Sequence, residues 1–475
     1  MRPRLLLAAV AALLLLTACG PREVEPELLR YFTAETVGRH DEFKVPHRWN
    51  LIVDPALYLV FIGVFFGFKL NRRLKLWCER VTKRWGEVLG RVGLLSRVGG
   101  VLSKVWGDDT WGGALLFVLC FMLIMFVQNA PAAFYFTWWY EHQHGTSVET
   151  LAHWWWDVLK AGLTEAPVLS ALVFGMYGLA RRRRNWWLLL GVPSAVGILL
   201  IGGVLDPLRA QVFVDHEKLP EGEVKQAVVA TLKKASVEYE DVYVEKREKL
   251  TRRTNAYIAG DGPTRRIVLW DTLIKAMSPE EIANAVAHEL GHLKDRSPGR
   301  LFFASIAILP SLWALAVVMR WLGRKGRWGF EDDRDVAGLP MMFFVCWVAA
   351  LFADPLGNAY SRHMERRADQ YAFELLEQPA AFRSLMVKIA RNNLSDVHPP
   401  AYIRYIWAGH PPVMERIAAA EAFAKAKGLP MPEPSPSSSC SPTSSTRSSS
   451  RTSRRLRRRR TSSRCSSLDA FSEPA

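Results

Sequence analysis

The sequence predicts a mainly α-helical protein whose chain crosses a membrane several times. Its 475 residues are 49% hydrophobic and include 18 tryptophans, a composition that is unusual for a purely soluble protein. Long uncharged stretches alternate with short basic ones, as in membrane proteins with several spans. The six cysteines show no short paired spacing, so we expect neither a disulfide scaffold nor a thiolate metal site.

The first residues resemble a bacterial signal segment, and we assign residues 1–19 to a leader. Arg2 and Arg4 precede an apolar stretch from Leu5 to Leu16, and the sequence Leu-Thr-Ala-Cys ends at Cys19. That ending resembles a lipobox, which predicts cleavage before Cys19 and lipid modification of this cysteine. The alternative is an uncleaved and rather short first span.

Six later segments are long and apolar enough to cross a bilayer, which takes about 20 residues of helix. The clearest has no charged residue between Thr110 and Tyr140, whereas the first contains Asp54 and the third Glu165. The predicted spans are residues 51–70, 112–134, 161–180, 185–205, 301–322 and 338–356.

The formal net charge of +16 comes mostly from two segments. Residues 69–104 contain ten Lys or Arg and two acids, and residues 431–475 contain nine Arg and three acids. The first segment, the cluster Arg181–Arg184 and the basic loop at 324–327 all fall on one side of the predicted spans. Because Lys and Arg are retained on the cytoplasmic side, the charge is explained by membrane orientation, and we expect no nucleic-acid partner.

This orientation places residues 206–300 and everything beyond residue 357 on the opposite face of the lipid bilayer. We therefore expect a multi-pass protein of a bacterial cell (inner) membrane, with these segments facing the periplasm.

A β-hairpin is expected within the segment that follows the fourth span. Residues 254–259 and 265–270 have strand-like sequences and flank Gly260-Asp261-Gly262-Pro263. An exposed strand of such a hairpin can bind an extended peptide through main-chain hydrogen bonds.

The next segment contains the sequence His-Glu-Leu-Gly-His at residues 288–292, which is an HExxH motif. Ser278-Pro279-Glu280-Glu281 forms a capping box that predicts the start of a helix, and Ser297-Pro298-Gly299 ends it. On this helix His288 and His292 lie on one face and can bind a single metal ion, while Glu289 can reach a water molecule on that ion. The alternative is a chance match on an amphipathic helix.

Two further segments contain side chains that suit such a site. Glu365 and Asp369 share a helix face, so one can bind a metal while the other orients a ligand histidine; the alternative is a solvated acidic face. His410 and Arg416 follow in the sequence Gly-His-Pro-Pro-x-x-Glu-Arg and would suit a developing oxyanion. The alternative there is an ordinary loop before an Ala-rich helix.

Taken together, these motifs resemble the type I CAAX prenyl proteases, which are integral-membrane zinc metallopeptidases of the gluzincin kind. The resemblance extends from about Tyr31 to Ala424. Beyond HExxH and the Glu365 and His410 segments, it includes Tyr140-Glu141-His142-Gln143-His144-Gly145, Asp157–Lys160, Thr254–Tyr257 and Ile267–Leu273.

The resemblance implies a zincin-type metallopeptidase domain and one Zn²⁺ ion per chain. The implied zinc ligands are His288, His292 and Glu365. Glu289 would be the catalytic carboxylate, Asp369 would hold a ligand histidine, and the transition state would be stabilised by His410 and Arg416. The substrate backbone would pair with an edge strand formed by Asn255, Ala256 and Tyr257.

The resulting expectation is a zinc metalloendopeptidase that acts on peptide or protein substrates in a lipid bilayer. The family has seven spans, and its eukaryotic members act on the cytosolic side, whereas the charge pattern here places the site outside. We therefore expect cleavage of membrane or envelope proteins, as in quality control, in place of prenylated CAAX proteins. The alternatives are a non-catalytic membrane scaffold and a zinc hydrolase of lipid amides.

These predictions divide the chain into six regions. They are the leader at 1–19, a membrane region with four spans at 20–205, a soluble segment with the edge strand and the HELGH helix at 206–300, two further spans at 301–357, C-terminal catalytic helices at 358–427, and a disordered Ser- and Arg-rich tail at 428–475.

Overall fold

The computed structural model describes a helical protein with one small sheet. The described residues are 25–89, 110–200, 217–260, 262–295, 302 and 305–434. The predicted leader lies outside them, as does the tail from residue 435 onward.

The described residues of the six predicted spans are mostly helical, which agrees with the predicted class of fold, a mainly helical membrane protein. Residues 201–205, 301, 303 and 304 of these spans lie outside the described residues. Within the described ranges, four helical stretches are long and apolar enough to cross a membrane, namely Ala34–Gly67, Trp111–Gln143, Leu151–Arg182 and Val336–Leu376. The first is α2, the third is α7, and the last consists of a short turn, η5 (Val336–Gly338), followed by α15 (Leu339–Leu376). The second comprises α5 (Trp111–Ala133), a π-helix η2 (Phe134–Trp139) and α6 (Tyr140–Gln143). Two shorter apolar helices correspond to the other predicted spans: α8 (Trp186–Leu200) and α14 (Ile308–Gly323).

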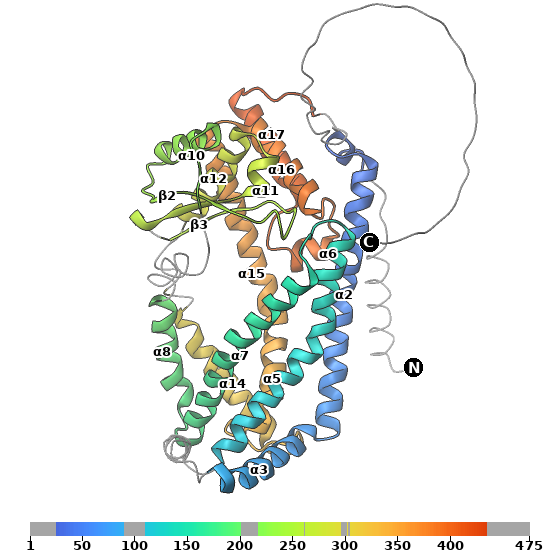
Figure 1. Cartoon of the computed structure of the whole chain (residues 1–475), viewed down its shortest axis with the longest axis vertical. Helices are drawn as coiled ribbons and strands as arrows, with labels where there is room; N and C mark the ends of the chain where they lie inside the picture. Colours follow the sequence, from blue (N-terminus) through green and yellow to red (C-terminus); the bar gives the residue numbers. More distant parts are fainter. Residues whose placement is uncertain are drawn as a thin grey trace, which may run out of the picture. The chain divides into compact units, whose positions relative to one another are not determined.

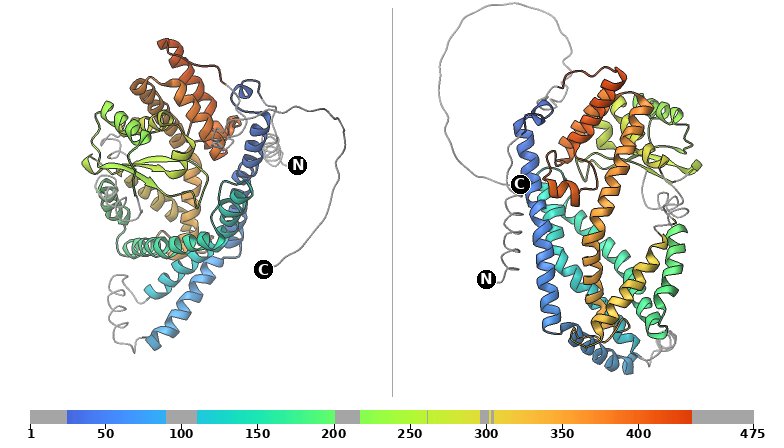
Figure 2. Two further views of the ribbon diagram at one scale, coloured as in Figure 1. Left: turned by 45° about the horizontal axis from the view of Figure 1, so that its top comes forward. Right: turned by 180° about the vertical axis from the view of Figure 1, so that it is seen from behind.

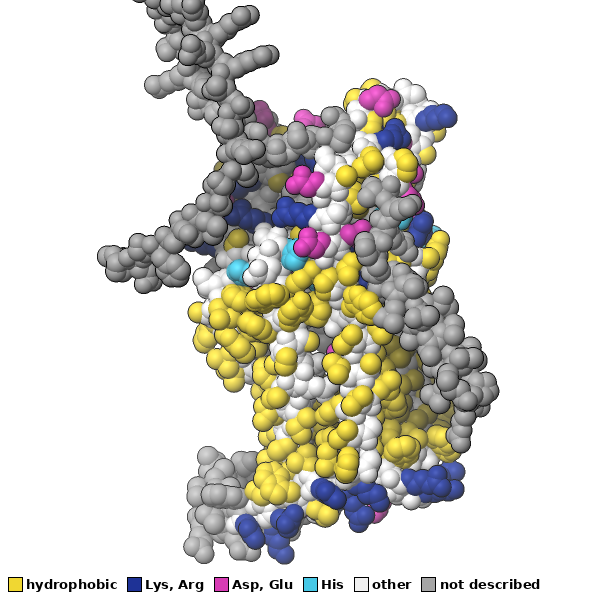
Figure 3. Space-filling model, turned by 90° about the vertical axis from the view of Figure 1, so that its right-hand side faces the viewer, with side chains coloured by type: hydrophobic (Ala, Val, Ile, Leu, Met, Phe, Trp, Pro, Cys, Tyr) yellow, Lys and Arg dark blue, Asp and Glu magenta, His cyan; other side chains and the backbone are white. Residues whose placement is uncertain are grey.

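The predicted basic loop begins as an amphipathic helix, α3 (Leu70–Leu89), at the end of the molecule away from the sheet (Figure 1). Asn71 and Cys78 are buried on its inner face, whereas Arg72, Arg73 and Arg80 are exposed. Figure 3 shows a broad band of apolar side chains that ends at a rim of Lys and Arg. Such a band, bordered by cations, is what a helix bundle presents to lipid hydrocarbon and to the headgroups.

The sheet contains four short strands in the order β1-β2-β4-β3. β2 runs parallel to β4, and β3 runs antiparallel to β4. The predicted hairpin is thus present as β3 and β4. The strands are β1 (Glu217–Lys218), β2 (Asp241–Glu245), β3 (Ala256–Ala259) and β4 (Arg266–Trp270).

Helices pack around this sheet and form a second core next to the membrane helices (Figures 1 and 2). They are α10 (Glu223–Lys234), α11 (Asp271–Ala276), α12 (Pro279–Lys294), α16 (Pro379–Asn393) and α17 (Val413–Lys427). The long helix α15 belongs to both halves: Met341 and Met342 pack in the membrane core, and Phe373 packs in the core around the sheet. It therefore brings residues from the end of a membrane span directly to the sheet domain.

Candidate active site

The HExxH motif lies on α12, which begins at the predicted capping box. Ser278 Oγ accepts a hydrogen bond from Glu281 N–H, and the Glu281 carboxylate accepts one from Ser278 N–H. Ile282, Val286 and Leu290 are buried in the core on one side of the helix. His288 and His292, one turn apart, therefore project together from another side.

The third proposed ligand comes from α15, which packs along α12. Glu365 is buried, and its Oε1 lies 3.1 Å from His292 Nε2 while its Oε2 lies 3.4 Å from His288 Nε2. The two imidazole Nε2 atoms are 3.2 Å apart. Ligand atoms of the three side chains all lie within 4.8 Å of one another, so one ion can contact all of them.

The close approach of α12 and α15 depends on Gly291. A Cβ atom added at Gly291 would lie 2.6 Å from the Cα atom of Ala368, which is closer than real Cβ atoms approach other atoms. The glycine inside the motif thus lets the backbone of α15 lie against that of α12, within reach of both histidines.

Asp369 lies one turn beyond Glu365 and holds His288 from behind. Its Oδ1 lies 2.9 Å from His288 Nδ1. Arg416, on α17, donates two hydrogen bonds to the same carboxylate, at 2.6 and 2.8 Å. When Nδ1–H of His288 donates to Asp369, its Nε2 lone pair is free to face Glu365 and His292.

The donor set fits a zinc ion. Two imidazole nitrogens and one carboxylate with an open fourth position are the ligands of a catalytic zinc. Glu365 Oε2 is buried without a well-oriented hydrogen bond, although His410 Nδ1 lies 2.9 Å away. Burial and the cation of Arg416 lower the pKa of His288, yet hydrogen bonds to Asp369 and Glu365 raise it overall, to about 9. The carboxylates thus strongly favour a cation at this point.

A cavity of about 560 Å³ opens beside these residues. Of the predicted site residues, it is lined by Asn255, Ala256, His288, Glu289, Glu365, His410 and Arg416. Burial raises the pKa of Glu289, as it does for a carboxyl group that exchanges protons at a sheltered site. His410 reaches the cavity from the loop before α17 and is 71% exposed.

The three remaining predicted residues, His292, Asp369 and Tyr257, do not line this cavity. His292 lies beside Glu365 in the candidate metal-binding cluster. Asp369 lies behind His288, as expected for an orienting residue. Tyr257 lies on the predicted strand, but its hydroxyl donates a hydrogen bond to Glu245 on β2.

Several lining residues were not found by sequence reasoning. Asn393 from α16 is one of them, and Lys44 from α2 is another. Neither belongs to a spaced motif, and each is brought to the cavity only by the packing of distant helices, so nothing in the local sequence marks them.

β3 is the last strand of the sheet within the described residues and borders the cavity through Ala256. Its register with β4 pairs Tyr257 with Val268 and Ala256 with Leu269, and Trp270 N–H donates to Asn255 O. In an antiparallel pair, alternate residues direct both main-chain groups to the partner strand. Asn255 and Tyr257 therefore bond toward β4, and the main-chain groups of Ala256 face the open edge.

Comparison with known proteins gives two family matches that together span most of the chain. The model of peptidase family M48 matches residues 218–424. The model described as CAAX prenyl protease N-terminal, five membrane helices, matches residues 51–207.

Curated relatives agree with these matches. The uncharacterized metalloprotease YhfN of Bacillus subtilis (strain 168) is 30% identical over 290 residues, covering 58% of this chain and 66% of the relative. A CAAX prenyl protease 1 homolog of Oryza sativa subsp. japonica is 27% identical over 315 residues, covering 65% of this chain and 73% of the relative.

A solved structure shows the same fold. The crystal structure of S. mikatae Ste24p superposes with a TM-score of 0.65 at 18% sequence identity, covering 85% of this chain and 93% of that chain. These matches agree with the HExxH helix and with a third candidate ligand on α15, the helix packed against it. The chain therefore belongs to peptidase family M48, with the CAAX prenyl protease N-terminal region, and is a membrane metallopeptidase.

Proposed function

We propose that this peptidase is a zinc metalloendopeptidase in which His288, His292 and Glu365 bind the zinc ion and Glu289 is the general base. The observation that supports it most is the convergence of the three side chains within 4.8 Å from two helices, with Asp369 bonded to the outer nitrogen of His288. A zinc ion in such a site polarises the scissile carbonyl and lowers the pKa of a coordinated water toward neutrality.

The remaining chemistry belongs to side chains of this chain. Glu289 takes a proton from the attacking water and returns it to the departing amine. His410, exposed at the mouth of the cavity, donates to the oxygen on which charge builds. Arg416 donates one hydrogen bond to each carboxylate oxygen of Asp369. In this proposal, these bonds fix Arg416 where it can stabilise the oxyanion, and they keep Asp369 in contact with His288.

The open edge of β3 supports a peptide substrate in preference to a lipid amide. An extended peptide can add to this edge through the main-chain groups of Ala256, next to Glu289 in the same cavity. A lipid amide offers no strand-like backbone and would leave the edge unused.

The decisive substitution is Glu289→Gln. The amide keeps the shape of the side chain but cannot accept the proton of water, so we expect cleavage of unfolded β-casein to fall by at least about a hundredfold. Zinc content, measured by elemental analysis of the purified protein, should stay at one ion per chain in the proposal. Removing zinc with 1,10-phenanthroline should abolish wild-type activity, and adding zinc should restore it.

Glu280→Gln is the matched control, since Glu280 is an exposed carboxylate on the first turn of the same helix. It should retain full activity. A metal-loaded Glu289→Gln protein that still cleaves casein would show that another group is the base, and a well-folded wild type that takes up no zinc would disprove the metal site.

We further propose that the active site faces away from the cytoplasm of a bacterial cell membrane and that the substrates are membrane or envelope proteins, as in quality control. Helix α3, on which Arg72, Arg73 and Arg80 are exposed, lies at the opposite end of the helix bundle from the sheet (Figure 1). This is the arrangement expected for an external site.

A further inference from the structure

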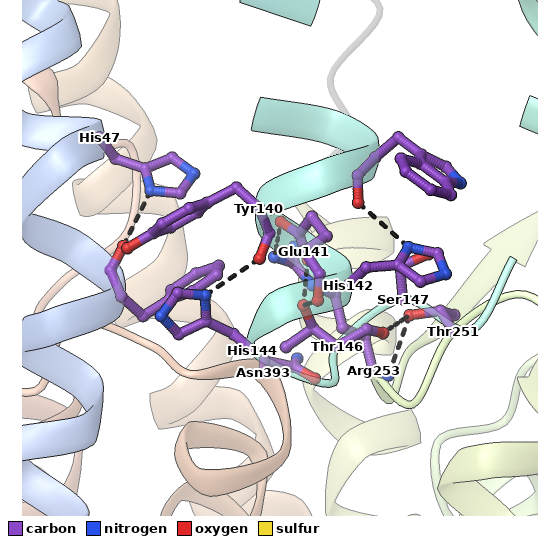
Figure 4. A network of polar contacts seen from close by, with 12 residues as sticks. His47, Tyr140, Glu141, His142, His144, Thr146, Ser147, Thr251, Arg253 and Asn393 are labelled. Carbon is purple, nitrogen blue, oxygen red and sulfur yellow. Dashed lines mark hydrogen bonds and ion pairs between the residues drawn. The ribbon is translucent and has the colours of Figure 1, made fainter. Parts of the chain in front are cut away.

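The segment Tyr140–Gly145 stood out in the sequence but contributes no residue to the cavity lining. In the structure it lies next to residues 250–254, which lead directly into β3 (Figure 4). His142 and His144 bond through Nδ1 to the main-chain oxygens of Trp138 and Tyr140 one turn earlier, so neither is directed at the metal site. The polar side chain with a longer reach is that of Glu141.

Main-chain hydrogen bonds first join the two segments. Ser147 and Thr251 form an isolated antiparallel bridge. On either side of it, Val148 N–H donates to Leu250 O at 3.0 Å and Arg252 N–H donates to Thr146 O at 2.9 Å. The loop before β3 is thus paired with the loop that follows α6, as if the two were short neighbouring strands.

The side chain of Glu141 contacts both paired segments. Its carboxylate accepts a hydrogen bond from Thr146 Oγ1 and lies 2.5 Å from Arg253 Nη2. The Glu141 side chain is 14% exposed and that of Arg253 is 38% exposed, so the ion pair is shielded from water on the carboxylate side. Thr272 Oγ1 in turn donates to Arg253 O at 2.7 Å, which fixes the carbonyl of the same residue.

Asn393, the last residue of α16, forms hydrogen bonds with the main chain of Thr254, the residue after Arg253. Its Oδ1 accepts from Thr254 N–H at 2.9 Å, and its Nδ2 donates to Thr254 O at 3.2 Å. By the register of the hairpin, Thr254 and Ala256 direct their main-chain groups to the same open edge. The Asn393 amide therefore occupies the edge at Thr254 as a neighbouring strand would, and the edge left for a substrate begins at Ala256.

We propose that Glu141 and Asn393 are positioning residues for the substrate, which fix the loop before β3 so that the open edge at Ala256 stays aligned with Glu289. This inference rests on the proposed function, namely that a peptide pairs with β3. It gives the Tyr140–Gly145 segment a role in catalysis although it lies outside the cavity.

The test uses the full-length enzyme and the variants Glu141→Gln and Asn393→Ala. The probe is a quenched fluorescent peptide copied from a site that the wild type cleaves in β-casein, with a series of peptides each N-methylated at one backbone nitrogen around the scissile bond. N-methylation removes one main-chain donor, so in the wild type one or two positions should lower kcat/KM by about tenfold, as expected for one lost hydrogen bond.

In both variants we expect KM for the unmodified peptide to rise about tenfold, with a smaller change in kcat and with zinc content unchanged. The penalty for N-methylation should shrink at the same positions, because the edge is no longer held for pairing. Glu248→Gln is the matched control: it removes the exposed ion pair with Lys275 in the same stretch of chain, but not a contact to residues 251–254.

Peptide binding can be followed without turnover in the Glu289→Gln background. There, Glu141→Gln and Asn393→Ala should each raise the dissociation constant of the peptide about tenfold. Folded, zinc-loaded variants with wild-type KM, or with an unchanged penalty for N-methylation, would overturn the inference while leaving the peptidase intact. A wild type that cleaves no peptide at all would instead overturn the proposed function, and this inference with it.

Discussion

Gly291 shows how a single missing side chain allows the site to form. The HExxH pattern allows any residue at its two variable positions, yet here one of them lies against the backbone of Ala368. The proposed ligands on α12 and α15 can converge only because no Cβ atom separates the helices at that point.

We therefore predict that Gly291→Ala weakens zinc binding without touching a ligand. The added methyl group must displace α15, and overpacking of this kind costs about 1–3 kcal/mol. Since the displaced helix contains Glu365, zinc affinity should fall by about tenfold or more, as measured by competition with a chelating dye. Gly357→Ala, on α15, serves as the control, because a Cβ atom added there meets no atom within 4 Å. Unchanged affinity in Gly291→Ala would show that the contact is not needed.

At the level of single residues, the sequence predicted the site residues that belong to a motif of fixed spacing. His288, Glu289 and His292 follow from HExxH, and Glu365 follows from the resemblance. Asn393 could not be found in this way, because its role depends on the C-terminal end of α16 meeting a loop more than a hundred residues earlier. Nothing in the local sequence records that contact.

α12 is stabilised at its first turn by a carboxylate with more than one function. Glu281 caps the helix, and it also accepts a hydrogen bond from Ser384 Oγ at 2.6 Å and pairs with Lys388 Nζ at 2.7 Å. Both partners lie on α16, so the capping residue also joins the motif helix to the helix that holds Asn393.

Glu281→Ala should therefore destabilise the sheet domain more than the loss of an ordinary cap, which costs about 0.5–2 kcal/mol. The substitution leaves Lys388 without its partner and removes the Ser384 contact as well. The expected result is a lower midpoint of thermal unfolding in detergent, with early loss of activity on heating. Glu280→Ala removes the neighbouring exposed carboxylate and should have a small effect; equal effects of the two would contradict the bridging role.

Among the elements, local patterns predicted the β3–β4 hairpin and the start of α12, while longer-range order was missed. The parallel pairing of β2 with β4 joins strands separated by β3, and short parallel pairs leave no turn signal. The length of the first membrane helix was also underestimated: α2 begins at Ala34, before the predicted span 51–70, and continues through Pro46 and Pro55. In membrane helices proline is tolerated where neighbouring helices, Ser or Thr side chains, water molecules or local changes of helix geometry satisfy the freed main-chain groups.

For the whole molecule, the position of the cations predicts the side on which proteolysis occurs. Cysteine introduced at Lys233 on α10 should react with a membrane-impermeant maleimide in intact spheroplasts, in a background whose native cysteines are replaced. Cysteine at Arg80 on α3 should react only after the membrane is permeabilised. Both positions are exposed in the structure, so a lack of labelling reflects the membrane and not burial. The reverse pattern would place the active site in the cytoplasm.

The order of the proposed ligands along the chain has a consequence for biogenesis. His288 and His292 precede α14, and Glu365 lies beyond the membrane portion of α15, near the end of the last candidate span. A nascent chain that has left the ribosome only as far as α14 has two of the three ligands and lacks Arg416 altogether. If the proposed ligands bind the zinc ion, synthesis of the final candidate span completes the metal site, and we expect a chain that ends before this span to lack peptidase activity.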